Sequence, residues 1–306
     1  MNNNHSFVGS SVALITPMFD DGSVDYESLN HLIDFHIDAG TSSIVSVGTT
    51  GESATVGVKE HLKIIKHTVD YAAKRIPIIA GTGANSTSEA IELTQEAKRL
   101  GADACLLVTP YYNKPTQEGL FQHYKLIAET VDINQILYNV PGRTAVNMSV
   151  DTTVRLAEID NISYIKESTT DTRRVYQIND LCGDKITVFA GYLGYESFMV
   201  GAEGWVSVCA NILPAKSAKM FELAVDQNDK DAAWNVFKEL VPIIDFLGDH
   251  LYVHGMKAAF KMMGRDMGDP RPPRLPLPKS KESELRVVLE QAGLLDFELP
   301  CVKTAA

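Results

Sequence analysis

The sequence has few cysteines and no spacing that groups them. Only four of its 306 residues are cysteine, at positions 105, 182, 209 and 301, and no two of them form a C-x-x-C pattern. Cys105 and Cys209 lie within short apolar runs, so we expect buried free thiols there, not disulfides or metal ligands. This usage is typical of a reducing cytoplasm, where we expect the protein to act.

Long hydrophobic runs and excess positive charge are also missing. No apolar stretch reaches the roughly 20 residues of a membrane-spanning helix, and the N-terminal MNNNHSFVGS lacks the features of a secretory signal. We therefore expect no membrane association. Lysine and arginine total 28 against 39 aspartate and glutamate, a net charge of −11. This balance argues against nucleic acid as a partner, although a few local cations can still bind a small anionic substrate.

Several catalytic signatures are absent as well. The chain has no Gly-Lys-Ser/Thr phosphate-binding turn and no G-x-S-x-G nucleophile motif. His61 and His67 are too far apart on one helix for an i, i+4 metal pair, and His250 and His254 have that spacing outside the main repeat pattern. We expect neither a metal site nor a cofactor.

What the sequence does contain is a repeated alternation of short apolar runs and longer amphipathic segments. The apolar runs lie at residues 12–15, 44–47, 78–80, 105–108, 135–138, 162–166, 187–190 and 205–208. Helical patterns between them include residues 26–39, 59–74, 86–100 and 117–130. Ser86 and Glu89 have the pattern of a capping box, and Gly101 follows where that helix should end.

Runs that are apolar throughout are typical of parallel strands covered on both faces. Eight strand–helix units predict a (β/α)8 TIM barrel, with a doubly wound open sheet as the alternative. After the eighth run only helices are predicted, at 215–225, 231–247, 254–263 and 281–291, with a proline-rich connector at 269–278. We therefore predict a catalytic barrel over residues 1–228 and a small helical C-terminal domain over 229–306.

Polar and catalytic residue types follow the apolar runs. In (β/α)8 barrels, the carboxyl ends of the strands form the active-site face. The residues at these ends include Gly48-Thr49-Thr50-Gly51-Glu52-Ser53, Thr109-Pro110-Tyr111-Tyr112-Asn113, Tyr138, Arg143, Lys166 and Gly191. Hydroxyls, glycines and two cations therefore gather on one rim, which indicates a functional site.

Lys166 is the most informative of these residues. Strand alternation would place Ile162, Tyr164 and Lys166 on one face. An ammonium group inside a barrel is unfavourable unless it is paired or loses its proton, and the free amine can attack a carbonyl carbon to form a Schiff base. The alternative is a strand-end lysine that extends into solvent.

The neighbouring residues also allow two interpretations each. The 48–51 turn is either an ordinary strand-to-helix connection or a nest of N–H groups for a carboxylate. Tyr111, Tyr112 and Tyr138 are either packing residues or phenols that face the rim. Arg143 is either a solvated loop cation or a clamp for a substrate carboxylate.

Four motifs resemble the dihydrodipicolinate synthases of the pyruvate-dependent class I aldolase family, which also includes N-acetylneuraminate lyase. They are GTTGES, TPYYN, YNVPGRT and IKEST, and they occur in the family's order at the predicted strand ends. The resemblance implies an enzyme that condenses pyruvate with L-aspartate-4-semialdehyde to 4-hydroxy-tetrahydrodipicolinate. It also implies a homo-oligomer, most simply a tetramer made of two tight dimers.

The resemblance further implies a role for each matching residue. Lys166 would form the Schiff base, and Thr49, Tyr138 and a neighbouring subunit's Tyr112 would relay the proton. Thr49 and Thr50 would bind the pyruvate carboxylate, Arg143 the second substrate, and Gly191 and Val206 would supply backbone contacts. The positions that match the lysine-inhibition site of some bacterial synthases are Ser53, Ala54, His61, Asn85, Glu89 and Tyr111, with Val58 where many have a histidine.

The sequence departs from the synthase pattern in three places. Gly191-Tyr192-Leu193 replaces Gly-Asp-Asp, Trp205 replaces a smaller residue, and 251–257 replaces an Asn-Pro-x-Pro-x-Lys segment. We expect these changes at the far wall of the cavity, where the second substrate binds. The alternatives are therefore a 1-pyrroline-4-hydroxy-2-carboxylate deaminase, a 2-keto-3-deoxy sugar acid aldolase, or a metabolite-binding protein that has kept the lysine.

Overall fold

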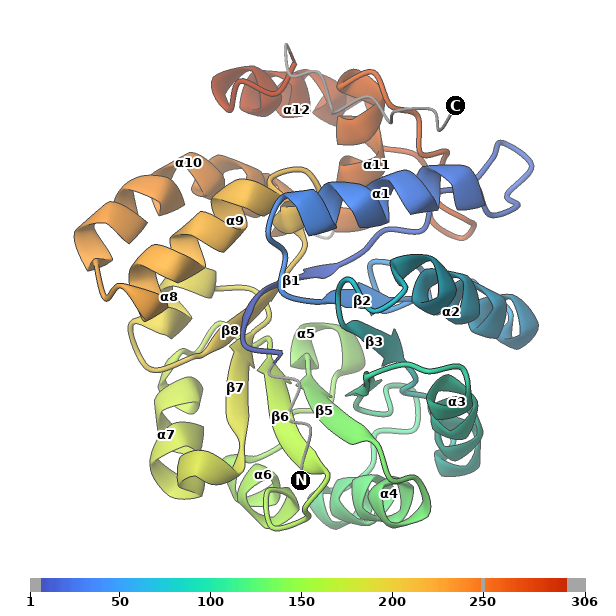
Figure 1. Ribbon diagram of the computed structural model, residues 1–306, viewed down its shortest axis with the longest axis vertical. Coiled ribbons are helices and arrows are strands. Elements are labelled where there is room, and N and C mark those ends of the chain that lie inside the picture. The colour runs from blue at the N-terminus through green and yellow to red at the C-terminus, as the bar shows by residue number, and fades with distance from the viewer. Residues whose placement is uncertain (1–6, 249–250, 296–306) are drawn as a thin grey trace.

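A computed structural model describes residues 7–248 and 251–295 of the chain. In this part of the chain, eight parallel strands close into a barrel, because β1 pairs with both β2 and β8 (Figure 1). The strands are β1 (Gly9–Ala13), β2 (Ile44–Ser46), β3 (Ile78–Gly81), β4 (Ala104–Val108), β5 (Asn134–Asn139), β6 (Ile162–Glu167), β7 (Thr187–Ala190) and β8 (Gly204–Ser207). The predicted (β/α)8 barrel is confirmed.

The strands are buried on both faces because they separate two apolar clusters. Val45 and Phe189 belong to a small cluster that fills the barrel. Ile44 and Val188, each one residue earlier in its strand, belong to the larger cluster between the strands and the helices. This arrangement explains why the runs are apolar throughout and do not alternate.

The first strand begins earlier than predicted. β1 spans Gly9–Ala13 and not 12–15, because Gly9, Ser10 and Ser11 pair with β8 although they are not apolar. The buried hydroxyl of Ser11 is hydrogen-bonded to that of Ser43, with an Oγ–Oγ distance of 2.6 Å. Polar residues form a strand here because a neighbouring side chain satisfies them, which hydropathy alone does not reveal.

The expected alternation along β6 is wrong at Ile162. Gln135 of β5 is paired with Ile162, but the next residue, Ile136, is paired with Tyr164. The extra residue, Ser163, is a β-bulge, and it places Ile162 in the outer cluster while Tyr164 lies in the inner one. The bulge leaves the second half of the strand directed so that Tyr164 and Lys166 share the inner face.

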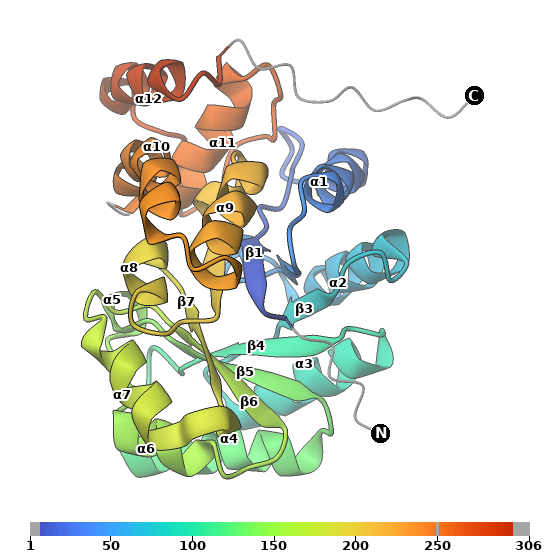
Figure 2. The same ribbon diagram turned by 60° about the vertical axis from the view of Figure 1, so that its left-hand side comes forward.

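Helices surround the barrel, as Figures 1 and 2 show. They are α1 (Tyr26–Asp38), α2 (Val58–Ala72), α3 (Thr87–Arg99), α4 (Gln117–Thr130), α6 (Val150–Leu156), α7 (Arg173–Cys182), α8 (Gly194–Phe198) and α9 (Pro214–Phe221). Shorter helical segments are α5 (Pro141–Thr144), η1 (Gly183–Lys185), η2 (Cys209–Asn211) and η3 (Glu222–Asp226). The four helical patterns predicted between the strands correspond to α1–α4.

The ends of α3 test the capping prediction. Ser86 is the N-cap residue, but its side chain makes no capping bond, and its hydroxyl is instead hydrogen-bonded to that of Ser88 at 2.8 Å. The predicted capping box is therefore wrong, because a nearer hydroxyl competes for Ser86. Gly101 has a φ of +91°, a conformation that favours glycine, and it follows the helix as predicted.

Three helices follow the barrel: α10 (Lys230–Gly248), α11 (Tyr252–Met262) and α12 (Lys279–Gln291). Figures 1 and 2 show them stacked at one end of the molecule. Residues 263–278 contain neither helix nor strand, in agreement with the proline-rich connector predicted at 269–278. None of the described helices is long and apolar enough to cross a membrane.

The prediction of buried free thiols is confirmed at Cys105 and Cys209. Cys182 is also a buried free thiol. Burial raises the pKa of the Cys105 thiol to about 12 and that of Cys209 to about 11, so both remain protonated and unreactive. Cys301 and His250 lie outside the described residues.

Candidate active site

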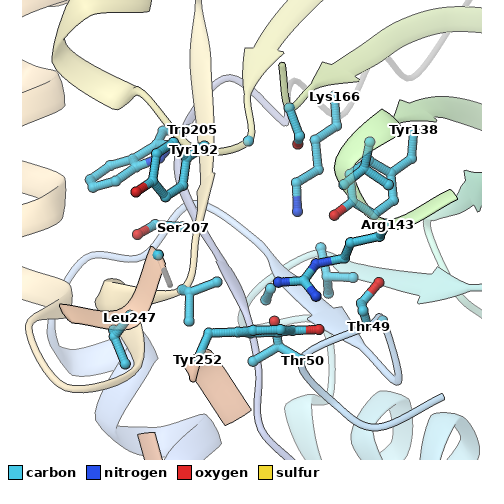
Figure 3. A pocket seen from close by; sticks show the side chains of 18 of the residues that line it. Thr49, Thr50, Tyr138, Arg143, Lys166, Tyr192, Trp205, Ser207, Leu247 and Tyr252 are labelled. Atoms are coloured by element: carbon cyan, nitrogen blue, oxygen red, sulfur yellow. The ribbon is translucent and has the colours of Figure 1, made fainter. Parts of the chain in front are cut away.

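A cavity of about 300 Å³ opens at the carboxyl ends of the strands (Figure 3). Its walls come from strand ends on one side and from α10 and α11 on the other. The lining residues include Thr49, Thr50, Tyr138, Arg143, Lys166, Ser168, Gly191, Tyr192, Trp205, Leu247 and Tyr252. The structure therefore brings together six of the sequence-predicted residues, namely Thr49, Thr50, Tyr138, Arg143, Lys166 and Gly191.

Lys166, the last residue but one of β6, lies inside this cavity and not in solvent. Its exposed fraction is 4%, and Nζ lies 4.4 Å from the centre of the Tyr138 ring. Burial lowers the pKa of Lys166 to about 7, and the positive charge of Arg143 acts in the same direction. No carboxylate among the described residues forms an ion pair with it. A large fraction of the amine is therefore neutral near pH 7 and able to attack a carbonyl carbon.

Tyr138, at the end of β5, provides the hydroxyl beside this amine. The phenol is buried, and burial raises its pKa, while the charge of Arg143 and the hydroxyls of Ser168 and Thr49 lower it. The side chain is therefore a neutral phenol among hydroxyl groups. Such a group can pass a proton through hydrogen bonds without forming a free charge.

Thr49 and Thr50 lie in a tight turn that follows β2. Val47 and Glu52, on either side of the turn, have φ values of +51° and +65°, which L-residues seldom adopt. The turn is closed by hydrogen bonds from the Ser53 amide to the Gly48 carbonyl and from the Glu52 amide to the Thr49 carbonyl, both 3.2 Å. Both threonines line the cavity, so their hydroxyls are available to a bound carboxylate.

Gly191, just after β7, leaves room for the reactive side chains. A Cβ atom here would lie 1.6 Å from Ser168 Oγ and 3.1 Å from Lys166 Cε. Only glycine allows this approach, so Gly191 has a steric role in addition to any backbone contact. Val206 is fully buried in the cluster that fills the barrel and does not line the cavity.

Arg143 extends from the short helix α5 across the mouth of the cavity. Its guanidinium lies 4.0 Å from the ring centre of Tyr252 in α11. Burial raises the pKa of Tyr252, so its ring is a neutral phenol that can stack on the cation. Figure 3 shows this pair opposite Lys166. Arg143 is thus a positioned cation, not a freely solvated one.

The departures from the synthase pattern meet on one wall, as predicted. Tyr192, Trp205 and Tyr252 all line the cavity, as does Leu247 (Figure 3). The indole Nε1 of Trp205 is buried and has no hydrogen-bond partner in the described part of the chain. This wall is largely apolar, and it contrasts with the hydroxyl-rich wall formed by the strand ends.

Tyr112 is the predicted catalytic residue that this chain does not bring to its own cavity. It lies on the loop after β4, is 87% exposed and is not among the lining residues. The loop is held by Asn85, whose Oδ1 accepts a hydrogen bond from the Tyr111 amide at 2.7 Å. A side chain this exposed is free to extend toward another molecule.

The predicted lysine-site residues lie near this loop and the adjoining turn. Asn85 and Tyr111 are joined by the bond just described, while Ser53, Ala54 and Glu89 are partly or fully exposed. His61 is buried, and its Nε2 lies 2.7 Å from the Gly81 carbonyl oxygen. Burial lowers its pKa, so His61 is a neutral ring.

Ser168, Leu247 and Ile244 also line the cavity, although they are not among the site residues predicted from the sequence. Ser168 had a signal, because it follows Lys166 by two residues and so continues the inner face of the strand. Leu247 and Ile244 had none, since their position depends on how α10 packs across the barrel.

A closed barrel with a buried, unpaired lysine among hydroxyls at the strand ends defines an enzyme of the Schiff-base class. Comparison with known proteins narrows this class. Residues 6–292 match the model of the dihydrodipicolinate synthetase family. The chain belongs to this family.

Named relatives and solved structures similar to this chain are also dihydrodipicolinate synthases. A 4-hydroxy-tetrahydrodipicolinate synthase from Ruthia magnifica subsp. Calyptogena magnifica is 50% identical, with 95% of this chain and 99% of that protein covered. The crystal structure of a chloride-inhibited dihydrodipicolinate synthase from Acinetobacter baumannii, complexed with pyruvate, has a TM-score of 0.90 at 48% identity, covering 94% and 100% of the two chains. The Aquifex aeolicus enzyme has a TM-score of 0.91 at 42% identity, covering 94% and 98%.

Proposed function

We propose that the protein is a 4-hydroxy-tetrahydrodipicolinate synthase, which condenses pyruvate with L-aspartate-4-semialdehyde. The observation that carries this proposal is the burial of the Lys166 amine in the cavity, 4.4 Å from the ring centre of Tyr138, whose hydroxyl interacts with that of Thr49. Membership of the family and about 50% identity to named synthases support the choice of reaction.

The reaction follows from the arrangement of these groups. The Lys166 amine attacks C2 of pyruvate, and loss of water gives an imine. The imine withdraws electrons, so a methyl proton leaves through Tyr138 and Thr49 and an enamine forms. The enamine carbon bonds to the aldehyde carbon, which restores the imine, and the aldehyde oxygen takes up a proton to become a hydroxyl group. The amino group of the second substrate then displaces Lys166 from C2, which closes the ring and frees the enzyme.

Two carboxylates must be held during this sequence. The Thr49 and Thr50 hydroxyls would bind the pyruvate carboxylate, and Gly191 would supply a backbone contact, whereas Val206, which does not line the cavity, would contribute only by packing inside the barrel. Arg143 lies across the cavity, where it would bind the carboxylate of the second substrate through paired N–H donors. The sequence of steps needs no metal or organic cofactor.

Borohydride reduction tests the proposal. Mass spectrometry should detect pyruvate fixed to the wild-type chain and not to a Lys166→Ala variant. Turnover with L-aspartate-4-semialdehyde completes the assignment. Turnover only of the 1-pyrroline-4-hydroxy-2-carboxylate imine or of a 2-keto-3-deoxy sugar acid would assign the related reaction instead. A trapped adduct without turnover of any substrate would identify a binding protein.

We further propose a cytoplasmic homo-oligomer built from tight dimers. The buried free thiols support the compartment. The proposed proton relay requires Tyr112, and this side chain is exposed on its own chain. Its exposure supports an oligomer in which Tyr112 reaches the cavity of a neighbouring subunit.

L-Lysine is the proposed effector at Ser53, Ala54, His61, Asn85, Glu89 and Tyr111. A synthase from Cyanidioschyzon merolae, 33% identical over 94% of this chain, has been solved with lysine bound. Calorimetric titration with L-lysine that gives no heat at millimolar concentration would remove this proposal.

A further inference from the structure

A buried ion pair joins the C-terminal helices to the turn that carries Thr49 and Thr50. Nζ of Lys257, in α11, lies 2.8 Å from Oε1 of Glu52, the residue that ends the turn. Glu52 is 0% exposed and Lys257 is 3% exposed. Neither residue lines the cavity, so neither contacts substrate directly.

Both ends of the pair have further partners from the same part of the chain. The other carboxylate oxygen of Glu52 accepts a hydrogen bond from the Arg271 amide at 2.8 Å. Lys257 also donates to the Asp269 carbonyl at 3.2 Å. Burial lowers the pKa of Lys257, while the negative charge of Glu52 raises it again. The carboxylate is thus held by α11 and by the connector that follows it.

The backbone of Glu52 is strained and is hydrogen-bonded to the turn that carries the two threonines. Its backbone has a φ of +65°, a strained conformation for an L-residue with a side chain. Its amide donates to the Thr49 carbonyl, and its carbonyl accepts from the Thr55 amide at 2.9 Å. A strained residue persists when its surroundings hold it, and here the surroundings are Lys257 and Arg271.

We propose that Glu52 and Lys257 are positioning residues for pyruvate: their ion pair holds the 48–53 turn in the geometry in which Thr49 and Thr50 meet the pyruvate carboxylate. The inference rests on the proposed function, since it assumes that pyruvate binds at these threonines. It makes the C-terminal helices part of the pyruvate site, although they are remote from Lys166 in the sequence.

A purely stabilising role can be separated from a positioning role. Replacement of a buried ion pair by apolar residues of similar volume is often neutral or stabilising, whereas removal of one partner leaves an uncompensated charge. A Glu52→Leu/Lys257→Met double variant should therefore regain thermal stability relative to either single variant. It should not regain the turn geometry, because no charged group then holds the strained residue.

The measurement is the pyruvate concentration that gives half-maximal borohydride trapping on Lys166, which requires no second substrate. This pyruvate concentration should rise at least about tenfold for Lys257→Met and for the double variant, since small misplacements of binding groups have effects of this order. KM for the second substrate should change less than about twofold, because the cation–π contact that orients Arg143 is made by Tyr252 and involves neither Glu52 nor Lys257. Thermal unfolding identifies the variants that are folded at the assay temperature.

Lys261→Met is the matched control. Lys261 lies one turn further along α11 and forms an exposed ion pair with Asp266. Removal of this ion pair should change neither the pyruvate concentration for half-maximal trapping nor KM for the second substrate. A folded double variant with the wild-type pyruvate requirement would overturn the inference, as would equal increases for both substrates. Absence of any pyruvate adduct on the wild-type protein would instead contradict the proposed function, so the two failures are distinguishable.

Discussion

The guanidinium of Arg143 lies 4.0 Å from the ring centre of Tyr252. This contact joins the loop after β5 to α11, and it crosses the mouth of the cavity opposite Lys166 (Figure 3). Tyr252 belongs to a segment whose sequence departs from the synthase pattern. The aromatic ring therefore orients the cation that the proposed mechanism assigns to the second substrate.

Replacement of Tyr252 should affect the second substrate and not pyruvate. A cation–π contact contributes about 0.5–2 kcal/mol, so a Tyr252→Leu variant should show a roughly 2- to 30-fold lower kcat/KM for the aldehyde. Its pyruvate requirement in borohydride trapping should be unchanged. Tyr252→Phe keeps the ring and is the control. Equal losses in the two variants would show that the hydroxyl, and not stacking, is what matters.

The rate of Schiff-base formation should follow the titration of Lys166. The amine must be neutral to attack, and its pKa is lowered to about 7. The initial rate of pyruvate trapping should therefore rise about tenfold between pH 6 and pH 8 and level off above that. Stopped-flow measurement on the wild-type protein would show this. A rate that continued to climb beyond pH 9 would mean that the lysine retains its ordinary pKa.

The same shift predicts a pH-dependent free energy of unfolding. The folded pKa of Lys166 is about 7, below the ordinary value of 10.5. Between these values the unfolded chain binds a proton that the folded chain does not, so stability rises with pH in this window. Below pH 7 both states are protonated, and the full penalty of the buried charge is present. From pH 7 to pH 9, the wild-type protein should gain about 2–3 kcal/mol relative to a Lys166→Met variant.

Urea denaturation of both proteins at each pH measures this difference. The comparison with Lys166→Met is needed because burial also lowers the pKa of Lys257, which contributes its own slope. A constant difference between the two proteins across the window would contradict the assignment of the shifted pKa to Lys166.

The residues that could be predicted are those placed by local pattern. Lys166, Tyr138 and Thr49 follow apolar runs, and parallel strands bring their carboxyl ends to one face whatever the rest of the chain does. Leu247 lines the same cavity from α10, and no local pattern encodes how that helix packs across the barrel. The Glu52–Lys257 pair could not be predicted either, because only the fold brings these two distant residues together.

Local competition explains the other differences. Ser86 has the sequence of a capping residue, but its hydroxyl bonds to Ser88. Ile162 obeys the alternation of an ideal strand, but the bulge at Ser163 reverses it. In both places a neighbouring group or an extra residue provides an alternative that the periodic pattern does not contain.

Addition of one methyl group at Gly191 should impair the site. A Cβ would lie 1.6 Å from Ser168 Oγ, so Gly191→Ala must displace either Ser168 or the strand end beside Lys166. Misplacement of this kind should lower the rate of pyruvate trapping by about tenfold to a hundredfold. Gly142→Ala is the matched control, because Gly142 also lines the cavity but has nothing within 4 Å of the added atom. Similar rates for both variants would show that the site adapts to the clash.

Subunit mixing tests whether Tyr112 acts in a neighbouring subunit. Loss of its hydroxyl in Tyr112→Phe should lower kcat about a hundredfold if it takes part in proton transfer, and Lys166→Ala should be inactive. In a mixed dimer, the site with an intact lysine would receive an intact Tyr112 from its partner. Co-expression of the two variants should therefore restore about a quarter of wild-type activity, since half of randomly formed two-fold dimers are mixed and each has one working site.

The control is the Tyr112→Phe variant expressed alone, which should keep its roughly hundredfold lower kcat. If the mixed dimers are no more active than this control, Tyr112 acts within its own chain or not at all. The first explanation would require the loop after β4 to fold back, because the side chain is 87% exposed and does not line the cavity of its own subunit. Recovery of activity would instead make the dimer a condition of catalysis, since the relay through Tyr138 and Thr49 would then end on a residue that only a second copy supplies.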